Sequence, residues 1–302
     1  MSKEGQPSIL ITGCSKGGAG NALALEFASK GYRVFATARS QKTLSNLKDK
    51  GIETLVLDVT SSESIGALKD EITSRTGGHL DVLFNNAGTL YEAPAVEADP
   101  VRVRALFETN VFGLMDMVSA FTSLLVASVA SNRSRSKTPT IVNVASVLAR
   151  LPNPFSSAYN ASKAAVASYS DTLRLELQPL GVKVVTLYMG EVSTPLMATE
   201  NINFGAHSLY RDVEEAVKAR TTTHLEKTMQ PAEFARQVVA SVIHGKDAFM
   251  WKGSNAFVVW LLNAVGPRKV FDSVMLKNAG LHTAEAKSNV YKLGQKWVGK
   301  AA

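Results

Sequence analysis

Short apolar runs recur along the first 190 positions of the chain, and longer segments of mixed polarity separate them. The runs are apolar at nearly every position and rich in β-branched residues. This pattern is typical of parallel strands that are buried on both faces. We predict strands at residues 8–13, 32–39, 53–60, 80–88, 140–147 and 182–190.

The segments between these runs have the spacing of helices. Residues 21–31 show helical apolar spacing and end at a glycine, and residues 64–78 have a similar pattern. Longer helices are predicted at 100–130 and from about 156 to 180, before Gly181. Because alternating strands and helices form right-handed βαβ units, the sequence predicts an α/β fold, a Rossmann-type doubly wound parallel sheet with helices on both faces.

No linker rich in Pro or Gly divides the chain, so we expect residues 1–302 to form a single domain. The net charge is +7, and apart from residues 132–137 the cations read as spread along the chain. This favours anionic small molecules or a membrane surface, and we expect no nucleic-acid partner. The single cysteine, Cys14, excludes a disulfide framework, and no apolar signal stretch precedes residue 8. We therefore expect a cytoplasmic protein, without a metal site.

A glycine-rich turn, TGCSKGGAG at residues 12–20, lies between the first predicted strand and the first helix. Glycines let the backbone approach a pyrophosphate, and the helix N-terminus offers N–H donors to it. An ordinary tight turn is the alternative, but the strand–turn–helix context favours a dinucleotide site. The expected contact residues are Gly13, Ser15, Lys16, Gly18, Ala19 and Gly20.

The end of the second predicted strand indicates which dinucleotide binds. An acidic residue there would bind the ribose of NAD, but the chain has Ala38 followed by Arg39. A small residue beside an arginine leaves room for a 2′-phosphate and offers it a bidentate partner, and Lys16 adds a second cation. We therefore predict NADPH/NADP+ as the cofactor, although two solvated surface cations are the alternative. Asp58 and Val59 are placed to meet the adenine, and Asp58 is alternatively a helix cap.

Tyr159 and Lys163 lie four positions apart and hence on one face of a predicted helix. A free phenol has a pKa near 10, and a nearby ammonium lowers it, which makes a proton donor usable at neutral pH. A surface tyrosine stacked on a lysine stem is the alternative. Ser146 and the NNAG stretch at 85–88 follow strands of the same sheet edge, where doubly wound sheets bind ligands. This context favours an acid–base pair.

Together these motifs resemble those of the short-chain dehydrogenase/reductase family, in its single-domain branch. They span residues 9–196 in the family's order and spacing. The matching pieces are TGCSKGGAG, LDVT, NNAG, Asn110 in ETNVFG, Ser146, Tyr159 with Lys163, and GEVST at 190–194. The resemblance implies an NADP(H)-dependent oxidoreductase that acts on CH–OH and C=O groups.

The resemblance also implies a role for each residue. Tyr159 donates a proton to the carbonyl oxygen as hydride arrives, and Lys163 lowers the pKa of Tyr159 and holds the nicotinamide ribose. Ser146 orients the carbonyl, and Asn110 supports a water that relays protons through Lys163. Besides Tyr159 and Lys163, the expected cofactor contacts on this side are Asn86, Ala87, Gly88, Val192 and Thr194. Members of the family are usually homo-oligomers, dimers or tetramers.

The sequence departs from the family's pattern at three places. The glycine turn is one residue longer than usual, so we align Gly18 to Gly20 with the family's second Gly-x-Gly and leave Lys16 or Gly17 as the insertion. Met189-Gly190 stands where the family often has Pro-Gly, which is expected to loosen this turn. Residues 131–139 form a longer connection than usual, and we expect a mobile surface loop there.

The resemblance also predicts how the chain is organised. Residues 8–194 are expected to form the cofactor-binding and catalytic core, and residues 195–230 a lid over the substrate. The apolar residues of this lid either line a hydrophobic pocket or only pack the lid. Residues 231–302 are expected to form C-terminal helices and a tail. The tail contains WKGSNA at 251–256, then an apolar run, Pro267 and a basic pair. In this it resembles fungal NADPH-dependent 1-acyldihydroxyacetone phosphate reductases, which act at lipid droplets or the endoplasmic reticulum. Residues 256–269 are thus a candidate peripheral membrane contact, or alternatively a cover for the sheet or an oligomer contact.

These observations lead to one main functional hypothesis and two alternatives. The main hypothesis is an NADPH-dependent reductase of a carbonyl on a hydrophobic substrate, with 1-acyl-dihydroxyacetone phosphate as the leading candidate. The first alternative is the same chemistry on a biosynthetic ketone, a secondary metabolite or a sterol-like molecule. The second is a cofactor-binding scaffold without redox activity, which the presence of Asn110, Ser146, Tyr159 and Lys163 disfavours.

Overall fold

The computed structural model describes residues 6–131 and 138–301. One sheet of seven parallel strands forms the centre of the protein, in the order β3-β2-β1-β4-β5-β6-β7. The strands are β1 (Ser8–Ile11), β2 (Arg33–Ala38), β3 (Glu53–Val56), β4 (Val82–Asn85), β5 (Thr140–Ser146), β6 (Lys183–Met189) and β7 (Phe249–Lys252). The strand order reverses direction between β1 and β4, and ligands of doubly wound sheets bind at such a point.

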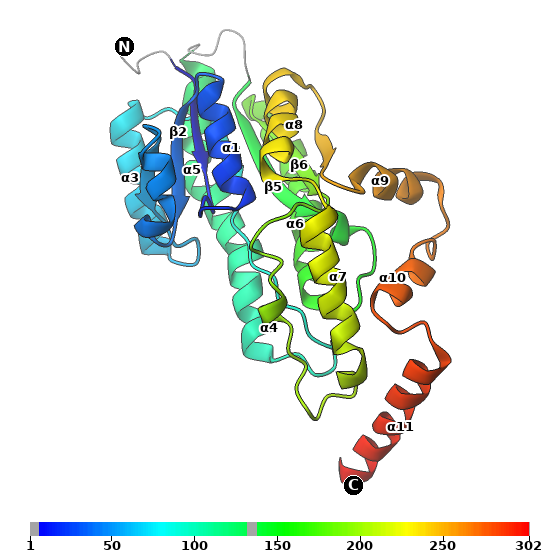
Figure 1. Ribbon diagram of the computed structural model, residues 1–302. Coiled ribbons are helices and arrows are strands. Elements are labelled where there is room, and N and C mark those ends of the chain that lie inside the picture. The colour runs from blue at the N-terminus through cyan, green and yellow to red at the C-terminus, as the bar shows by residue number, and fades with distance from the viewer. Residues whose placement is uncertain (1–5, 132–137, 302) are drawn as a thin grey trace.

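Helices cover both faces of this sheet (Figure 1). On one face, α1 (Ala19–Ser29) and α8 (Pro231–His244) bury Phe27 and Phe234 against the strands. On the other face, α3 (Ser62–Thr76), α5 (Gly113–Ala130) and α6 (Ser157–Leu177) bury residues such as Phe121. Both faces of the strands are therefore apolar because both are covered, and the predicted Rossmann-type fold is confirmed.

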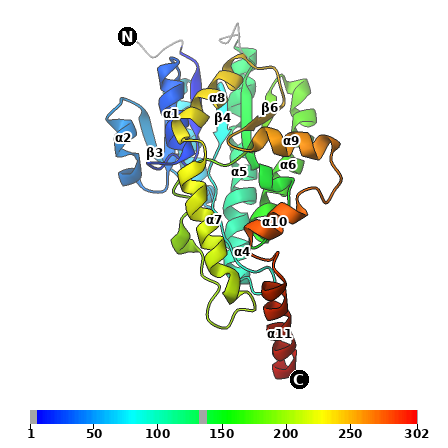
Figure 2. The same cartoon turned by 45° about the vertical axis from the view of Figure 1, so that its right-hand side comes forward.

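The remaining helices surround the carboxyl end of the sheet or lie outside it (Figure 2). The short α2 (Ser45–Lys48) precedes β3, and α4 (Pro100–Phe107) precedes α5. The segment after β6 contains α7 (Glu214–Lys227). Three helices follow β7 in the chain: α9 (Ala256–Val265), α10 (Asp272–Asn278) and α11 (Ala284–Ala301).

The structure corrects two element predictions. The seventh strand, β7, was missed, because its run of four residues is short and is followed at once by a glycine. The helix predicted at 100–130 is interrupted by a π-turn at Glu108–Phe112, which includes Asn110.

The helix with Tyr159 ends as predicted, in a short 3₁₀ turn before Gly181, whose φ is 73°. Of the loop predicted at 131–139, residues 132–137 lie outside the described residues.

One described helical stretch, Pro100–Ala130, is long and apolar enough by composition to cross a membrane. Half of its most apolar window is buried inside the protein. Phe121 and Leu125 in this stretch are fully buried against the sheet and its neighbouring helices. The stretch is therefore a core element of this fold.

Candidate active site

A pocket of about 1550 Å³ lies at the carboxyl edge of the sheet. Its lining includes residues at the ends of β1, β4, β5 and β6, represented by Gly13, Ala87, Ser146 and Met189. From this edge it extends past α7 to α9 and α10. Most of the residues predicted from the sequence to bind or react line this one pocket.

The glycine turn is packed tightly against the end of β4. A side chain at Gly13, whose φ is 73°, would stand 2.8 Å from the Cα atom of Ala87. At Gly20 it would stand 2.4 Å from the carbonyl oxygen of Gly13. The Asn86 amide donates to the carbonyl oxygens of Thr12 and Gly13, at 2.9 and 3.0 Å. Gly20 thus allows this packing and does not line the pocket, and Asn86 holds the turn in place.

The turn enters α1 through two glycines. Gly18 is the N-cap of α1, whereas Gly17 has a φ of 82° and lies against Pro195. Ser15 and Lys16 are exposed at the pocket, and Ala19, also in the lining, opens the helix. The N-terminus of α1 thus faces the pocket, as a pyrophosphate site requires.

At the other end of the cleft, Ala38, Arg39, Asp58 and Val59 all line the pocket. Hydrogen bonds from the backbone and hydroxyl of Thr60 lower the pKa of Asp58, and Arg39 lowers it further. The cap of α3 is a different residue, Ser61, whose side chain accepts a hydrogen bond from Ser64. The alternative role of Asp58 as the cap of this helix is therefore wrong.

Tyr159 and Ser146 meet at the end of β5. A hydrogen bond with Ser146 lowers the pKa of the Tyr159 phenol, but burial has the larger effect and raises this pKa to about 12. The Ser146 hydroxyl accepts from the Leu148 N–H at 3.1 Å and donates to the Met189 carbonyl at 3.4 Å. The phenol is therefore protonated at neutral pH and has a hydroxyl beside it.

Lys163 is buried, and its Nζ donates to the Val144 carbonyl at 2.8 Å. Nζ lies 5.8 Å from the centre of the Tyr159 ring. Burial lowers the pKa of Lys163 to about 8. The expectation that Lys163 brings the pKa of Tyr159 below its ordinary value is wrong for this structure, because burial of the phenol outweighs any nearby charge.

Asn110 lies in the π-turn between α4 and α5 and is almost fully buried. Its side chain accepts from the Thr89 N–H at 2.7 Å and donates to the Thr89 carbonyl and the Ser162 hydroxyl. A side chain at Gly88 would lie 3.3 Å from Asn110 Oδ1 and 3.5 Å from Lys163 Nζ. Gly88 thus allows the loop after β4 to approach both residues.

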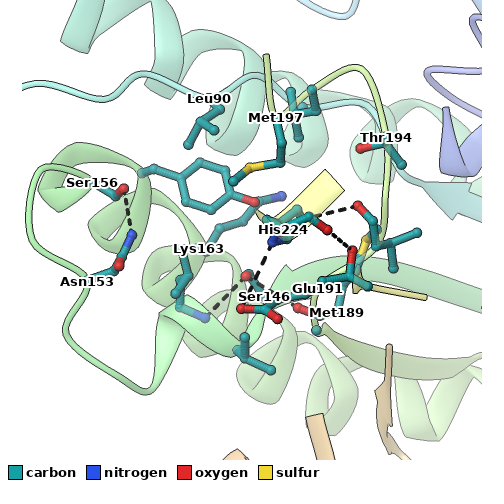
Figure 3. A pocket seen from close by; sticks show the side chains of 18 of the residues that line it. Leu90, Ser146, Asn153, Ser156, Lys163, Met189, Glu191, Thr194, Met197 and His224 are labelled. Carbon is teal, nitrogen blue, oxygen red and sulfur yellow. Dashed lines mark hydrogen bonds and ion pairs between the residues drawn. The ribbon is translucent and has the colours of Figure 1, made fainter. Parts of the chain in front are cut away.

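The turn after β6 is held by β7 and the residues that follow it. The Gly190 N–H donates to the Lys252 carbonyl at 2.7 Å, and Glu191 and Ser254 exchange two backbone hydrogen bonds at 3.0 Å. The turn with Met189-Gly190 is therefore anchored and not loosened. Val192 and Thr194 are buried side chains that line the pocket beyond this turn, and Thr194 is labelled in Figure 3.

The sequence analysis missed a polar cluster that links α7 to the start of α6. Arg220 of α7 forms an ion pair with the buried carboxylate of Glu92 and also donates to Asn153. Ser156 donates to Glu92 at 3.2 Å and accepts from Asn153 at 2.9 Å (Figure 3). All four line the pocket. Nothing in the local sequence marks them, because their partners are up to 128 positions apart.

Two more pocket groups were missed, His224 of α7 and Glu191 after β6. Their side chains approach to 4.0 Å, and the Glu191 carboxylate accepts a hydrogen bond from Asn255 at 2.8 Å. His224 also lies 3.4 Å from the Val192 carbonyl (Figure 3). Of the apolar residues in 195–230, Leu196 and Met197 line the pocket, whereas Ile202 and Phe204 pack with Phe155.

The residues around the cleft fit a dinucleotide with a 2′-phosphate. The open N-terminus of α1 suits a pyrophosphate. Ala38 leaves space at the end of β2, and Arg39 beside it is exposed and lines the cleft. Within the described residues, no group of three or more His, Cys, Asp or Glu side chains is arranged to hold a metal ion.

Comparison with known proteins agrees with this geometry. The sequence model described as short chain dehydrogenase matches residues 7–203. The chain is 36% identical over 276 residues to the short-chain dehydrogenase ptmH of Penicillium ochrochloron, with 91% of this chain and 98% of that protein covered. The protein therefore belongs to the short-chain dehydrogenase/reductase family, oxidoreductases that act on alcohol and carbonyl groups.

Two further similarities are more specific. The chain is 43% identical over 195 residues to the NADPH-dependent 1-acyldihydroxyacetone phosphate reductase of Schizosaccharomyces pombe, covering 65% of this chain and 63% of that protein. Among solved structures, a short chain dehydrogenase from Burkholderia cenocepacia J2315 in complex with NADP matches with a TM-score of 0.67 and 25% identity. The match covers 91% of this chain and 99% of that one.

The buried ammonium of Lys163 makes stability depend on pH. Its pKa in the folded protein, about 8, lies below its ordinary value of 10.5. Between these values the unfolded chain binds a proton that the folded protein releases. The free energy of unfolding therefore increases as the pH rises from about 8 to 10.5, by at most about 1.4 kcal/mol per pH unit.

We expect the Lys163→Met variant to lack this contribution. The difference in unfolding free energy, wild type minus variant, should then increase as the pH rises from 8 toward 10.5, measured by urea unfolding at several pH values. The exposed Lys48 provides the control, since Lys48→Met should follow the wild type. If the unfolding free energies of wild type and Lys163→Met changed in parallel with pH, the prediction would be contradicted.

Proposed function

We propose that the protein is an NADPH-dependent reductase that converts a carbonyl group on a hydrophobic substrate to an alcohol. One observation carries this proposal. The Tyr159 phenol, the Ser146 hydroxyl and the Lys163 ammonium converge at the end of β5, in the same pocket as the glycine turn and Arg39.

The choice of NADPH rests on the end of β2. Arg39 supplies a guanidinium that can hold a phosphate in a bidentate manner, and Ala38 stands where an acidic residue would favour NAD. Two similar proteins support the same choice, because one is named as NADPH-dependent and the other was solved with NADP.

The protonation state of Tyr159 provides a proton donor for the reduction. NADPH, when bound, supplies a hydride to the carbonyl carbon. Tyr159 then gives its phenolic proton to the carbonyl oxygen, which Ser146 orients by a hydrogen bond. Because burial keeps the phenol protonated, the donor is ready at neutral pH. Lys163 stabilises the resulting phenolate and returns a proton to it. Asn110 holds the loop after β4 close to Lys163.

The substrate side of the pocket is mainly apolar. Leu90, Leu148 and Met197 line it, and Val258 and Val274 extend the wall on α9 and α10. A pocket of about 1550 Å³ exceeds the usual size of small-ligand pockets, which is roughly 300–1000 Å³. It has room for a bulky hydrophobic group beside a dinucleotide.

Within this class we propose 1-acyl-dihydroxyacetone phosphate as the leading substrate. The apolar wall suits an acyl chain, and the exposed Lys227 and Lys277 of the pocket lining suit a phosphate. The partial similarity to a reductase of this name supports the choice. A neutral biosynthetic ketone is the competing substrate, since the relative that matches over most of the chain is named only as a short-chain dehydrogenase.

The proton donor is tested by Tyr159→Phe. We expect kcat for carbonyl reduction to fall by at least about 100-fold, the usual range for loss of general acid catalysis. The affinity for NADPH, measured by fluorescence titration, should stay within about threefold, since the phenol acts on the carbonyl. Tyr169→Phe on the same helix is the matched control and should keep full activity. Turnover that persists in Tyr159→Phe would place the proton donor elsewhere.

The cofactor assignment is tested by Arg39→Ala. Loss of a charged hydrogen bond to the 2′-phosphate should weaken NADPH binding by about 10- to 100-fold. NADH lacks this phosphate, so its affinity should change much less. Lys48→Ala removes a nearby exposed cation outside the pocket and should alter neither affinity. If Arg39→Ala lost affinity for NADPH and NADH to the same extent, the assignment of NADPH would be refuted.

The substrate is tested with three related ketones: 1-acyl-dihydroxyacetone phosphate, the same molecule without phosphate, and dihydroxyacetone phosphate without the acyl chain. We expect kcat/KM to fall by at least about tenfold when either group is removed, because each has its own surface in the pocket. Equal turnover with and without phosphate would favour the neutral ketone. NADPH binding without turnover of any carbonyl would support the non-redox alternative.

A further inference from the structure

The positive charge of the protein is concentrated at one end of the chain. Residues 252–302 contain eight Lys or Arg residues and only two acidic ones, a net charge of +6 out of +7 for the whole chain. The Lys and Arg residues are spread along the sequence as predicted, but their excess over acidic residues is concentrated in this segment. Arg268, Lys269 and Lys277 are exposed, and within the described residues no carboxylate forms an ion pair with them.

The same segment exposes large apolar side chains. On α9, Phe257 and Trp260 are 64% and 43% exposed, and their rings lie 5.5 Å apart. Leu261 and Val265 extend this face, at helical spacing. The opposite face of α9 is buried, through Ala256 and Val259, against the segment that follows Ser146. The helix is thus anchored on one side and presents a hydrophobic surface on the other.

Helices α10 and α11 also expose large apolar side chains. Val274 and Leu276 of α10 are exposed, and α11 extends away from the body of the protein in both views (Figures 1 and 2). Tyr291 and Trp297 of α11 are more than half exposed, and Lys292 is exposed between them. Exposed aromatic rings beside lysines are typical of helices that lie in the headgroup region of a bilayer.

The surface is continuous with the pocket. Val258 and Leu262 of α9 and Val274 of α10 line the pocket that contains Tyr159. Val258 and Val274 are also about half exposed to solvent. A hydrophobic molecule that enters between these helices therefore passes from the exposed surface to the predicted proton donor.

Charge distinguishes between two possible occupants of this surface. If a second copy of the chain covered it, two segments of net charge +6 would face each other, and like charges disfavour such a contact. An anionic lipid surface complements both the charge and the exposed apolar groups. The aromatic and aliphatic side chains would enter the acyl boundary while the cations meet the headgroups.

We propose that α9, α10 and α11 form a binding surface for anionic lipid bilayers. Binding holds the mouth of the pocket, between α9 and α10, against the bilayer. The binding itself is independent of the reaction. The benefit, direct entry of a hydrophobic carbonyl substrate from the lipid, rests on the proposed function.

The test is flotation of the full-length protein with phosphatidylcholine vesicles, with and without phosphatidylserine. We expect the wild type to float with the anionic vesicles, and to do so less at high salt. The double variant Phe257→Ser with Trp260→Ser should bind the vesicles at least about tenfold more weakly, since it lacks the two aromatic rings that would enter the bilayer. Arg268→Gln with Lys269→Gln should weaken binding to the anionic vesicles selectively.

Matched controls remove similar side chains elsewhere. Val96→Ser with Val101→Ser removes two exposed apolar residues outside α9 to α11, and Lys48→Gln with Lys50→Gln removes two exposed cations. Both should float like the wild type. NADPH binding, measured for every variant, reports that the fold is retained.

Three outcomes would overturn the proposal. The wild type does not float with anionic vesicles, or the α9 variant floats as well as its control, or light scattering shows that the α9 variant changes only the oligomeric state. The last outcome would make this face a contact between copies of the chain. Flotation needs no turnover, and the substrate test needs no vesicles, so failure of either leaves the other result intact.

Discussion

The close approach of the glycine turn to the end of β4 is the constraint on which the site depends. Any side chain at Gly13 or Gly20 would collide with backbone atoms at 2.8 Å or less, and Asn86 joins the two segments by hydrogen bonds. This contact brings the N-terminus of α1 next to the loop after β4. It thereby forms the crevice between β1 and β4, and β5 adds Ser146 to the same edge. If the two segments were further apart, the phosphate site and the proposed proton donor would not share one pocket.

Burial of charge is the second feature that defines the site. Lys163 is held in the interior by a single carbonyl acceptor in the described structure, and its pKa falls to about 8. Burial of an ammonium group costs free energy, which the surrounding apolar packing offsets. The same burial raises the pKa of the neighbouring phenol, so Tyr159 stays protonated. Low polarity around the pair thus keeps the proton on the phenol at neutral pH, where it is ready to be donated.

The sequence predicted the parts that depend on local pattern. Six strands, the glycine turn and the Tyr159–Lys163 pair follow from short motifs and their spacing. It did not predict β7, because four residues without periodic context carry little signal. The ion pair of Glu92 and Arg220 could not be predicted for another reason, since it joins α7 to a loop that is distant in the sequence. The pKa of Tyr159 was predicted in the wrong direction, because burial depends on tertiary packing and not on the Tyr–Lys spacing.

The missed strand also explains why the C-terminal segment belongs to the site. Through β7, the backbone at Gly253 and Ser254 lies against Gly190 and Glu191, at the turn that ends β6. Asn255, which opens α9, donates a hydrogen bond to the Glu191 side chain. A movement of α9 would therefore act on the turn that leads to Val192 and Thr194, the residues expected to meet the nicotinamide. A helix held at a lipid surface would be mechanically connected to the cofactor end of the pocket, so surface binding and substrate entry would share one structural element.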